Sequence, residues 1–474
     1  MEHTLDPVDW AELRAHGHRM VDDMVAYLAS VRERPAWQRV PEDVRQRLST
    51  PIPIEPEGIE AAYRDFVRDV LPYPVGVHPR YWAWVQGTTS PAGMLAELLT
   101  GAMNSCLHAG EHSAMYVEQQ VLSWLKDALG YPSEASGLLV GGGSMANFVG
   151  LAVARNAKAG WDVKREGLRG ARFVFYASTE THSSVAKALE ALGVGTQALR
   201  LVPVDRDFRI SLDGLTEAIA TDRRAGRVPL CVVGNAGTVN TGAIDDLPAL
   251  AEVCRAEDLW FHVDGAFGAI AAISPSLRPR GLDLTDSLAF DLHKWLYMPY
   301  DVGCALVRWP ELHRETFGFQ AAYLTSQDRG LTAGPVWFSH YGLDLSRGFR
   351  ALKVWFCLKT HGLAAYRALV EQNVAQMQYL GELIRAEERL ELLAPVTLNV
   401  VCFRYTGGIR DDTRLNAINN ELLLRLQESG VASPSSTMIN GRFALRVANT
   451  NHRSRREDFD MLVREVVRLG ASLI

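Results

Sequence analysis

Two charged residues stand where apolar segments of the sequence end. Lys294 follows the run DSLAFD and is flanked by His293 and Trp295, whereas Asp264 ends the run LWFHVD and is followed by Gly265. An amine in apolar surroundings is a good nucleophile for an aldehyde, and small neighbours leave room for a flat group beside a carboxylate. A lysine that extends to solvent and a structural ion pair between the two are the alternatives.

The spacing between Asp264 and Lys294 fits one strand, one helix and one further strand. Both side chains would then emerge at the carboxyl edge of a parallel sheet, where open α/β folds bind ligands. An aldehyde cofactor with a pyridine ring needs both groups. The amine forms the imine, and the carboxylate keeps the ring nitrogen protonated.

Two further segments supply groups that such a cofactor would need. Gly141, Gly142, Gly143 and Ser144 precede a helical segment, so backbone N–H groups at a helix N-terminus can bind a phosphate. The spacing is neither that of a P-loop nor that of a dinucleotide fold, and glycine clusters also form ordinary turns. His182 lies at a strand-to-helix junction, where its imidazole can cover a ring or cap the helix.

The elements that must position these residues alternate between strand-like and helical segments from about residue 92 to residue 308. Several of the strand-like runs are apolar on both faces, which is typical of a mainly parallel sheet covered by helices. The expected strands are ARFVFYAS, QALRLVPV, VPLCVVGNAG, LWFHVDG, DSLAFD and GCALVRW. A long helix from Arg350 to Glu388, the strands TLNVVCFRY and RFALRV, and two further helices predict a smaller α+β domain.

The N-terminal segment predicts an amphipathic helix followed by an extended arm. Asp6 and Pro7 read as the helix start, and apolar residues then recur at helical spacing from Trp10 to Val31. The prolines of STPIPIEPEG exclude a regular helix there. We expect this segment to pack across a neighbouring subunit, although packing on its own chain is equally compatible with the pattern.

Composition narrows the class of protein. The chain has 474 residues, a net charge of −6 and six cysteines without a CxxC spacing, so a nucleic-acid binder, a zinc knuckle and a disulfide framework are disfavoured. No apolar run reaches the length of a membrane span. His108 and His112 have metal-ligand spacing, but Gly110 interrupts the helix that would align them, so we expect no metal site. We expect a cytoplasmic protein.

Together these segments resemble the pyridoxal-phosphate-dependent group II decarboxylases, the family of aromatic-L-amino-acid decarboxylases. The resemblance covers His78 to Trp355 in family order, through HPRYWAWVQGTTSPAGMLAELL, the Gly-rich segment, THSSVAKALEALG, GTVNTGAIDDL, FHVDGAFG, DLHKW and LSRGFRALKVW. It implies the aspartate-aminotransferase fold (fold type I) and a homodimer with the active site between subunits. The implied division is an N-terminal arm at 1–77, a large cofactor-binding domain at 78–360 and a small domain at 361–474.

The resemblance also implies residue roles around pyridoxal 5'-phosphate (PLP). Lys294 would be the Schiff-base lysine, Asp264 the partner of the ring nitrogen, and His182 the imidazole stacked on the ring. Ala266 would contact the other face of the ring, with Thr238 near Asp264. The phosphate pocket would be formed by Ser144, Met145, Asp291 and His293.

The implied reaction is decarboxylation of an L-amino acid, which we expect to be aromatic, to the amine and carbon dioxide. Tyr323 occupies the place of a loop tyrosine that protonates Cα, and Tyr323 and His182 both match the decarboxylating form of the family. Substrate contacts would come from Trp84, Gln86, Cys106 and His108. A transaminase, an aldehyde-forming oxidative deaminase or a decarboxylase of a non-aromatic amino acid on the same fold is the alternative.

Overall fold

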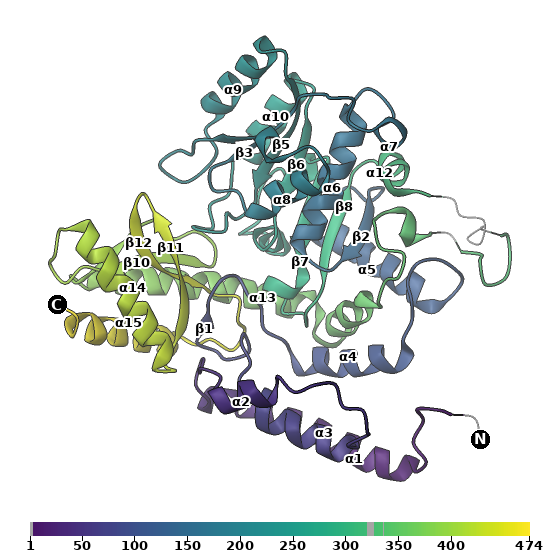
Figure 1. Ribbon diagram of the computed structural model, residues 1–474. Coiled ribbons are helices and arrows are strands. Elements are labelled where there is room, and N and C mark those ends of the chain that lie inside the picture. Colours follow the sequence, from purple (N-terminus) through teal and green to yellow (C-terminus); the bar gives the residue numbers. More distant parts are fainter. Residues whose placement is uncertain (1–2, 320–326, 335) are drawn as a thin grey trace.

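The computed structural model describes residues 3–319, 327–334 and 336–474. Its centre is a seven-stranded mixed sheet in the order β2-β8-β7-β6-β5-β3-β4 (Figure 1). The five strands β7, β6, β5, β3 and β4 lie side by side in this order and are parallel. Strand β8 runs antiparallel to both β7 and β2. The strands are β2 (Ser136–Val140), β3 (Phe173–Ser178), β4 (Leu199–Val202), β5 (Val228–Asn235), β6 (Trp260–Asp264), β7 (Ser287–Asp291) and β8 (Gly303–Val307).

This arrangement confirms the predicted α/β fold with a mainly parallel central sheet. Strands β3, β6, β7 and β8 are buried at every position, as expected where helices cover both faces. The helices of this part are α4 (Pro91–Met103), α5 (Ser113–Leu129), α6 (Gly143–Lys158), α7 (Val163–Glu166), α8 (Ser183–Ala191), α9 (Leu212–Arg224), α10 (Leu247–Ala256), α11 (Leu292–Trp295) and α12 (Pro310–Phe317).

The connection from Asp264 to Lys294 differs from the prediction. No α-helix lies between β6 and β7. The chain forms two 3₁₀ helices instead, η4 (Gly268–Ile273) and η5 (Leu282–Leu284). All six residues of η4 are buried, and Gly268 approaches the backbone of Ala236 so closely that a Cβ atom would not fit. The tight packing favours short 3₁₀ turns over an exposed α-helix, and β6 and β7 remain parallel neighbours.

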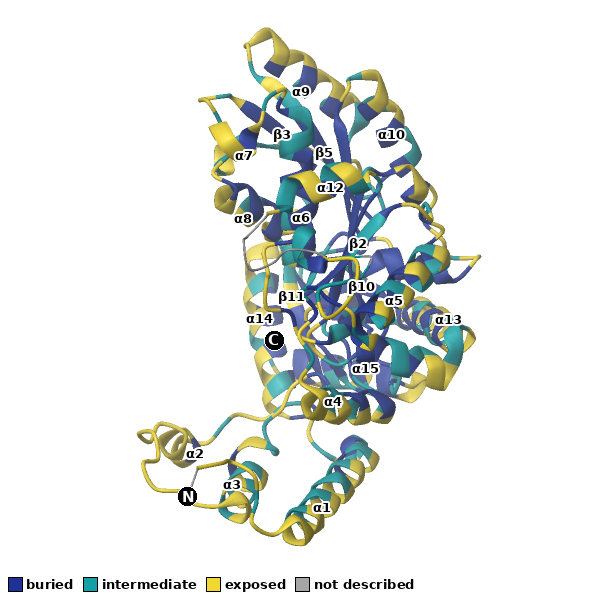
Figure 2. Ribbon diagram, turned by 90° about the vertical axis from the view of Figure 1, so that its right-hand side faces the viewer, coloured by how far each residue is buried: buried dark blue, intermediate teal, exposed yellow. Residues whose placement is uncertain are grey.

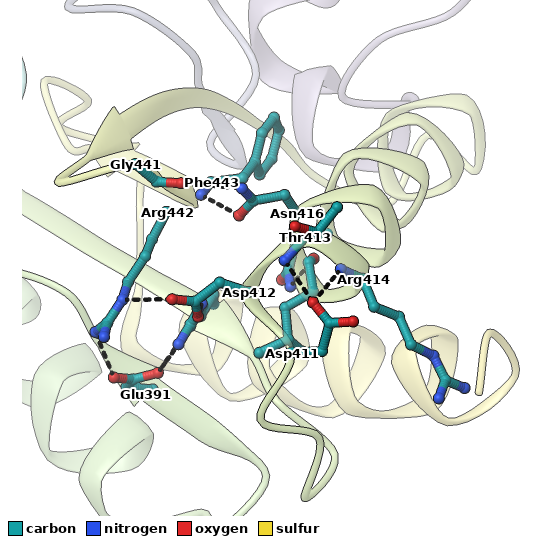
Figure 3. Close-up of polar contacts among 12 residues, drawn as sticks. Glu391, Asp411, Asp412, Thr413, Arg414, Asn416, Gly441, Arg442 and Phe443 are labelled. Atoms are coloured by element: carbon teal, nitrogen blue, oxygen red, sulfur yellow. Dashed lines mark hydrogen bonds and ion pairs between the residues drawn. The ribbon is translucent and has the colours of Figure 1, made fainter.

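A second sheet of five strands forms the small domain, in the order β1-β11-β12-β10-β9. Its strands are β1 (Tyr81–Trp82), β9 (Leu390–Leu392), β10 (Val400–Tyr405), β11 (Ser433–Ile439) and β12 (Arg442–Ala448), and its helices are α14 (Asp412–Glu428) and α15 (Arg456–Ala471). Figure 3 shows Arg442 bridging Asp412 and Glu391, and Asp411 capping α14 through the N–H groups of Thr413 and Arg414. These contacts join β9, β12 and the start of α14.

One long helix joins the two parts. Helix α13 (Arg350–Ala386) contacts α4 and α5 of the large part and α15 of the small part. It is kinked at Gly362, whose φ of 73° suits glycine. The predicted boundary between residues 360 and 361 falls beside this kink, whereas β1, which lies inside the predicted range 78–360, pairs with β11 of the small sheet.

The N-terminal helices form a separate layer below α4 (Figures 1 and 2). They are α1 (Trp10–Ala29), α2 (Glu42–Arg47) and α3 (Ile59–Asp65), and the segment 49–58 between α2 and α3 has no helix, as predicted. The predicted start at Asp6 is wrong. Asp9 caps α1 and accepts hydrogen bonds from the N–H groups of Ala11 and Glu12. No helix in the described ranges is long and apolar enough to cross a membrane.

Candidate active site

The ends of β6 and β7 bring the two predicted key residues to one cavity. Asp264 is the last residue of β6, and Lys294 lies in α11, which directly follows β7. The cavity has a volume of about 750 Å³. Among the residues predicted for the site, its walls include Trp84, Ser144, Met145, His182, Asp264, Ala266, Asp291, His293 and Lys294.

Lys294 forms an ion pair inside this cavity. Its Nζ lies 2.9 Å from Oδ2 of Asp291, one turn earlier in the chain, and the Asp291 carboxylate is almost completely buried. The other carboxylate oxygen, Oδ1, has no hydrogen-bond partner within the described part of the chain. The lysine therefore lines the cavity, and its ion pair is with Asp291 and not with Asp264.

The Gly-rich segment forms a tight turn at the start of α6. A Cβ atom on Gly143 would lie 2.9 Å from Oδ2 of Asp291, so only glycine fits. Gly142, the N-cap residue, provides no side-chain cap, and the cavity wall includes Ser144 and Met145 of the first turn. Uncapped N–H groups at a helix N-terminus suit a phosphate.

His293 adds a donor to the same pocket. The N–H of Val302 donates to its Nδ1 over 3.1 Å, so the proton of the neutral ring resides on Nε2. Burial lowers the pKa of His293, which keeps the ring neutral. The pocket thus combines helix N–H groups, an imidazole N–H and a lysine, a donor set that fits a phosphate and an aldehyde on one ligand.

Asp264 is a buried hydrogen-bond acceptor on the cavity wall. Its Oδ2 accepts from Nδ2 of Asn147 over 2.8 Å, and its Oδ1 accepts from the N–H of Ala266 over 3.0 Å. These two donated hydrogen bonds fix the orientation of the carboxylate. A carboxylate held in this way can accept a further N–H, such as that of a protonated pyridine ring.

His182 caps helix α8 and also lines the cavity. The N–H of Ser184 donates to its Nδ1 over 3.1 Å, and the Ser184 hydroxyl lies 2.9 Å from the same atom. The proton of the ring is therefore on Nε2. Burial lowers the pKa of His182 despite the attraction of Asp264, so the imidazole is neutral near pH 7.

The two tryptophans of the segment RYWAWV lie in different surroundings. Trp82 and Trp84 do not share a strand face, because β1 ends at Trp82 and Trp84 has a positive φ of 57°. Trp82 stacks on Phe459 in the core of the small domain, at 4.9 Å between ring centroids. Trp84 lines the cavity and is 62% exposed.

Four other predicted residues lie elsewhere. The backbone carbonyl of Gln86 accepts from Thr450, and neither Gln86 nor Cys106 nor His108 is part of the cavity wall in the described chain. The Thr238 hydroxyl accepts from the N–H of Ala243 and pairs with Thr241, beneath the cavity wall formed by Gly237, Val239 and Asn240. Tyr323 lies outside the described residues.

Arg446 lines the cavity without offering a free guanidinium. It donates to the carbonyls of Trp84, Val239 and Asn240 and to the Ser435 hydroxyl. The arginine therefore joins the turn after β1, the loop after β5 and strand β11 at the cavity wall. A search of the described ranges finds no group of three or more His, Cys, Asp or Glu side chains placed to hold a metal ion.

Sequence reasoning missed Asn147, which lines the cavity, and His262, which lies behind Asn147. Asn147 is the donor to Asp264, and His262 is hydrogen-bonded to Asn147 in turn. The signal for His262 was its position two residues before Asp264, which places both side chains on one face of β6. Asn147 had only a weak signal, because its role depends on how α6 packs on the sheet.

Comparison with known proteins agrees with this geometry. The family described as pyridoxal-dependent decarboxylase conserved domain matches residues 41–406. The chain belongs to this family. It is a PLP-dependent amino-acid decarboxylase, a carboxy-lyase.

Relatives of this decarboxylase differ in their named activities. An aromatic-L-amino-acid decarboxylase of Bacillus atrophaeus is 33% identical over 467 residues, covering 97% of this chain and 95% of the relative. A phenylacetaldehyde synthase of Petunia hybrida is 28% identical, and the match covers 94% of this chain and 92% of the relative. The crystal structure of Oryza sativa TDC with PLP and tryptamine superposes with a TM-score of 0.91 at 26% identity, covering 99% of both chains.

Proposed function

We propose that this decarboxylase converts an aromatic L-amino acid to its amine and carbon dioxide. The observation that carries the proposal is the set of Lys294, Asp264, His182 and the Gly-rich turn on the wall of one cavity. The named activity of the Bacillus relative, 33% identical over nearly the whole chain, supports the aromatic class. The Trp84 ring on the cavity wall offers an apolar surface for an aromatic side chain.

Each residue of the cavity wall has a separate proposed role toward the cofactor. PLP, when bound, supplies the aldehyde for amine attachment and a protonated ring that accepts the electron pair of the breaking Cα–carboxylate bond. In the proposal Lys294 holds the cofactor, the α6 N-terminus and His293 bind its phosphate, and Asp264 keeps its ring nitrogen protonated. The neutral His182 ring is proposed to cover one face of the cofactor ring.

The substrate carboxylate must leave, and the cavity suits this. Arg446 is the guanidinium on the cavity wall that is best placed to clamp a carboxylate, but its N–H groups already donate to backbone carbonyls and a hydroxyl. A substrate carboxylate would therefore remain without a bidentate partner there, which favours its loss over its retention. Tyr323, from the resemblance, is proposed to return the proton to Cα.

We also propose a homodimer with the active site near the subunit interface. Leu5, Val8, Ile52 and Ile54 of the N-terminal segment are strongly exposed in the single chain. Cys106 and His108 are proposed to approach the cavity of the partner subunit. Sedimentation equilibrium should give twice the chain mass of 52.4 kDa, and a monomer that is fully active would contradict this part of the proposal.

The function is tested by product analysis of the holoenzyme with single amino acids. Tryptophan, tyrosine, phenylalanine and 3,4-dihydroxyphenylalanine are compared with glutamate, aspartate and histidine, and amine, aldehyde and carbon dioxide are quantified. We expect equimolar amine and carbon dioxide from an aromatic substrate. Aldehyde with ammonia as the main products would identify an oxidative deaminase, and a keto acid without carbon dioxide would identify a transaminase.

A further inference from the structure

A chain of hydrogen bonds runs through the protein interior to Asp264. The indole Nε1 of Trp260 lies 2.8 Å from Oγ of Ser287, which lies 2.8 Å from Nδ1 of His262. Nε2 of His262 lies 2.9 Å from Oδ1 of Asn147, and Nδ2 of Asn147 lies 2.8 Å from Oδ2 of Asp264. All five side chains are buried. Of these five side chains, those of Asp264 and Asn147 line the cavity.

The chemistry of the groups gives this chain one direction. An indole N–H can only donate and a carboxylate can only accept, so Trp260 donates to Ser287 Oγ, and Asn147 turns its NH₂ group to Asp264. Oδ1 of Asn147 therefore faces Nε2 of His262, and Nδ1 of the same ring accepts from the Ser287 hydroxyl. The imidazole proton is then on Nε2 and is donated to Asn147 Oδ1. With its oxygen engaged, the Asn147 amide can present only its NH₂ group to Asp264.

The surroundings of His262 preserve this state. The ring is fully buried, and burial lowers the pKa of His262 to about 3, so the ring stays neutral at physiological pH. Gly150 of α6 makes room for it, because a Cβ atom there would lie 2.6 Å from Nδ1 and Cε1 of His262. The packing of His262 against α6 therefore explains why Gly150 stands in the middle of this helix.

The same amide also reaches the other predicted ring contact. The second Nδ2 proton of Asn147 is donated to Oγ of Ser184 over 3.0 Å, and that hydroxyl lies 2.9 Å from Nδ1 of His182. Both Asp264 and His182 thus depend on which way the Asn147 amide faces. A flipped amide would place its oxygen against the Asp264 carboxylate.

We propose that His262, supported by Ser287 and Trp260, is a positioning residue that fixes the Asn147 amide so that it donates to Asp264. The inference rests on the proposed pairing of Asp264 with the ring nitrogen of PLP. The hydrogen bond from Asn147 holds the Asp264 carboxylate in one orientation, in which it can accept the N–H of a protonated ring nitrogen. His262 touches neither cofactor nor substrate and acts only through Asn147.

The test measures the protonation of the ring nitrogen directly. Holoenzyme is reconstituted with PLP carrying ¹⁵N in the ring, and the ¹⁵N chemical shift separates the protonated from the unprotonated pyridine. Wild type is compared with His262→Phe and with Gly150→Ala, which displaces the imidazole without removing it. His313→Phe is the matched control, because His313 is also buried and bonded to a serine, Ser136, but is not part of the cavity wall.

We expect a protonated ring in wild type and in His313→Phe, and a shift toward the unprotonated ring in both His262→Phe and Gly150→Ala. Loss of a hydrogen bond to a charged group corresponds to a fall in kcat of about 10- to 100-fold, with cofactor affinity largely retained. A wild-type ¹⁵N shift in folded His262→Phe and Gly150→Ala would overturn the inference, as would an equal change in His313→Phe.

Asp264→Asn separates this inference from the function on which it rests. If Asp264→Asn deprotonates the ring while the His262 and Gly150 variants do not, the pairing of Asp264 with the ring stands and the role of His262 falls. If Asp264→Asn leaves the ring protonated, the proposed role of Asp264 itself falls.

Discussion

At the scale of single residues, Asp264 carries the electronic part of the proposed mechanism. Asp264→Asn preserves shape but removes the negative charge that supports a protonated ring. We expect kcat to fall by about three orders of magnitude or more, since electrostatic stabilisation of the transition state amounts to several kcal/mol. Cofactor affinity should change much less, because the phosphate and lysine contacts are untouched.

The control for this variant is Asp222→Asn. Asp222 is equally buried and pairs with Arg200, but it lies on α9, away from the cavity. This variant should lower stability without a comparable loss of kcat. Near-normal turnover of Asp264→Asn, or an equal loss in Asp222→Asn, would remove the proposed role of Asp264.

Tyr323 carries a second prediction at this scale, which rests on the resemblance of the sequence. Tyr323→Phe removes only a hydroxyl, the proposed proton donor to Cα. We expect carbon dioxide release to continue while the ratio of aldehyde to amine rises in the presence of oxygen. The ratio is measured on the best substrate found. An unchanged ratio and rate would show that another group supplies the proton.

Individual residues also show how far sequence reasoning reached. Lys294 and Asp264 could be predicted because a charge at the end of an apolar strand is conspicuous, and strand ends converge in a parallel sheet. The ion pair of Lys294 with Asp291 and the bond from Asn147 to Asp264 could not. The ion pair depends on the turn from β7 into α11, and the hydrogen bond depends on how α6 packs on β6.

At the scale of elements, the turn after β1 is packed against α11. A Cβ atom on Gly87 would overlap the backbone carbonyl oxygens of His293 and Lys294. Gly87→Ala therefore must displace the helix that carries the lysine, and overpacking of this kind costs about 1–3 kcal/mol. We expect weaker PLP binding and a lower unfolding temperature, measured by cofactor titration and calorimetry.

The control is Gly101→Ala on α4, where a Cβ atom meets nothing within 4 Å. A helical Gly→Ala change at an open position should be neutral or stabilising by about 1 kcal/mol. If Gly87→Ala binds PLP as tightly as Gly101→Ala does, then the close approach of Gly87 does not position Lys294.

The elements differ in how well their patterns predicted them. Long apolar strands such as β5 and β6 were predicted within two residues of their ends. Strand β11 was missed because its sequence SPSSTMI is mostly polar, and β2 because its run merges into the glycines that follow. The apolar segment of η4 has the composition of a helix, and only its packing against the backbone of Ala236 shows why it is a 3₁₀ turn.

At the scale of the whole molecule, buried histidines make stability depend on pH. Burial lowers the pKa of His262 to about 3 and that of His313 to about 4. The unfolded chain binds these protons near pH 6.5, so the free energy of unfolding falls as the pH drops below about 6.5. Each of the two histidines should lower the free energy of unfolding by about 2 kcal/mol between pH 7 and pH 5.

Denaturant unfolding at pH 7 and pH 5 measures this loss. His313→Phe removes one of the titrating groups, so its stability should fall by about 2 kcal/mol less than that of wild type over the same interval. A variant that loses as much stability as wild type between pH 7 and pH 5 would show that His313 is not held neutral in the folded state.

The whole molecule also marks a limit of single-sequence reasoning. The mainly parallel sheet and the smaller α+β part followed from hydrophobic patterns, but β1 of the small sheet comes from residues 81 and 82, far from β11 in sequence. Such a pairing has no local signal. The start of α1 was misplaced for a simpler reason, since Asp6 and Asp9 are both suitable caps and only the hydrogen bonds of Asp9 decide between them.

The central claim is that Lys294 holds the cofactor in the cavity between β6, β7 and α6. Borohydride reduction of the wild-type holoenzyme makes the lysine–cofactor bond permanent, and peptide mapping then locates it. We predict one modified peptide, with the cofactor on Lys294, and no covalent label in Lys294→Ala, which should still bind PLP noncovalently. A label on any other lysine of the wild type, or none at all, would contradict the account.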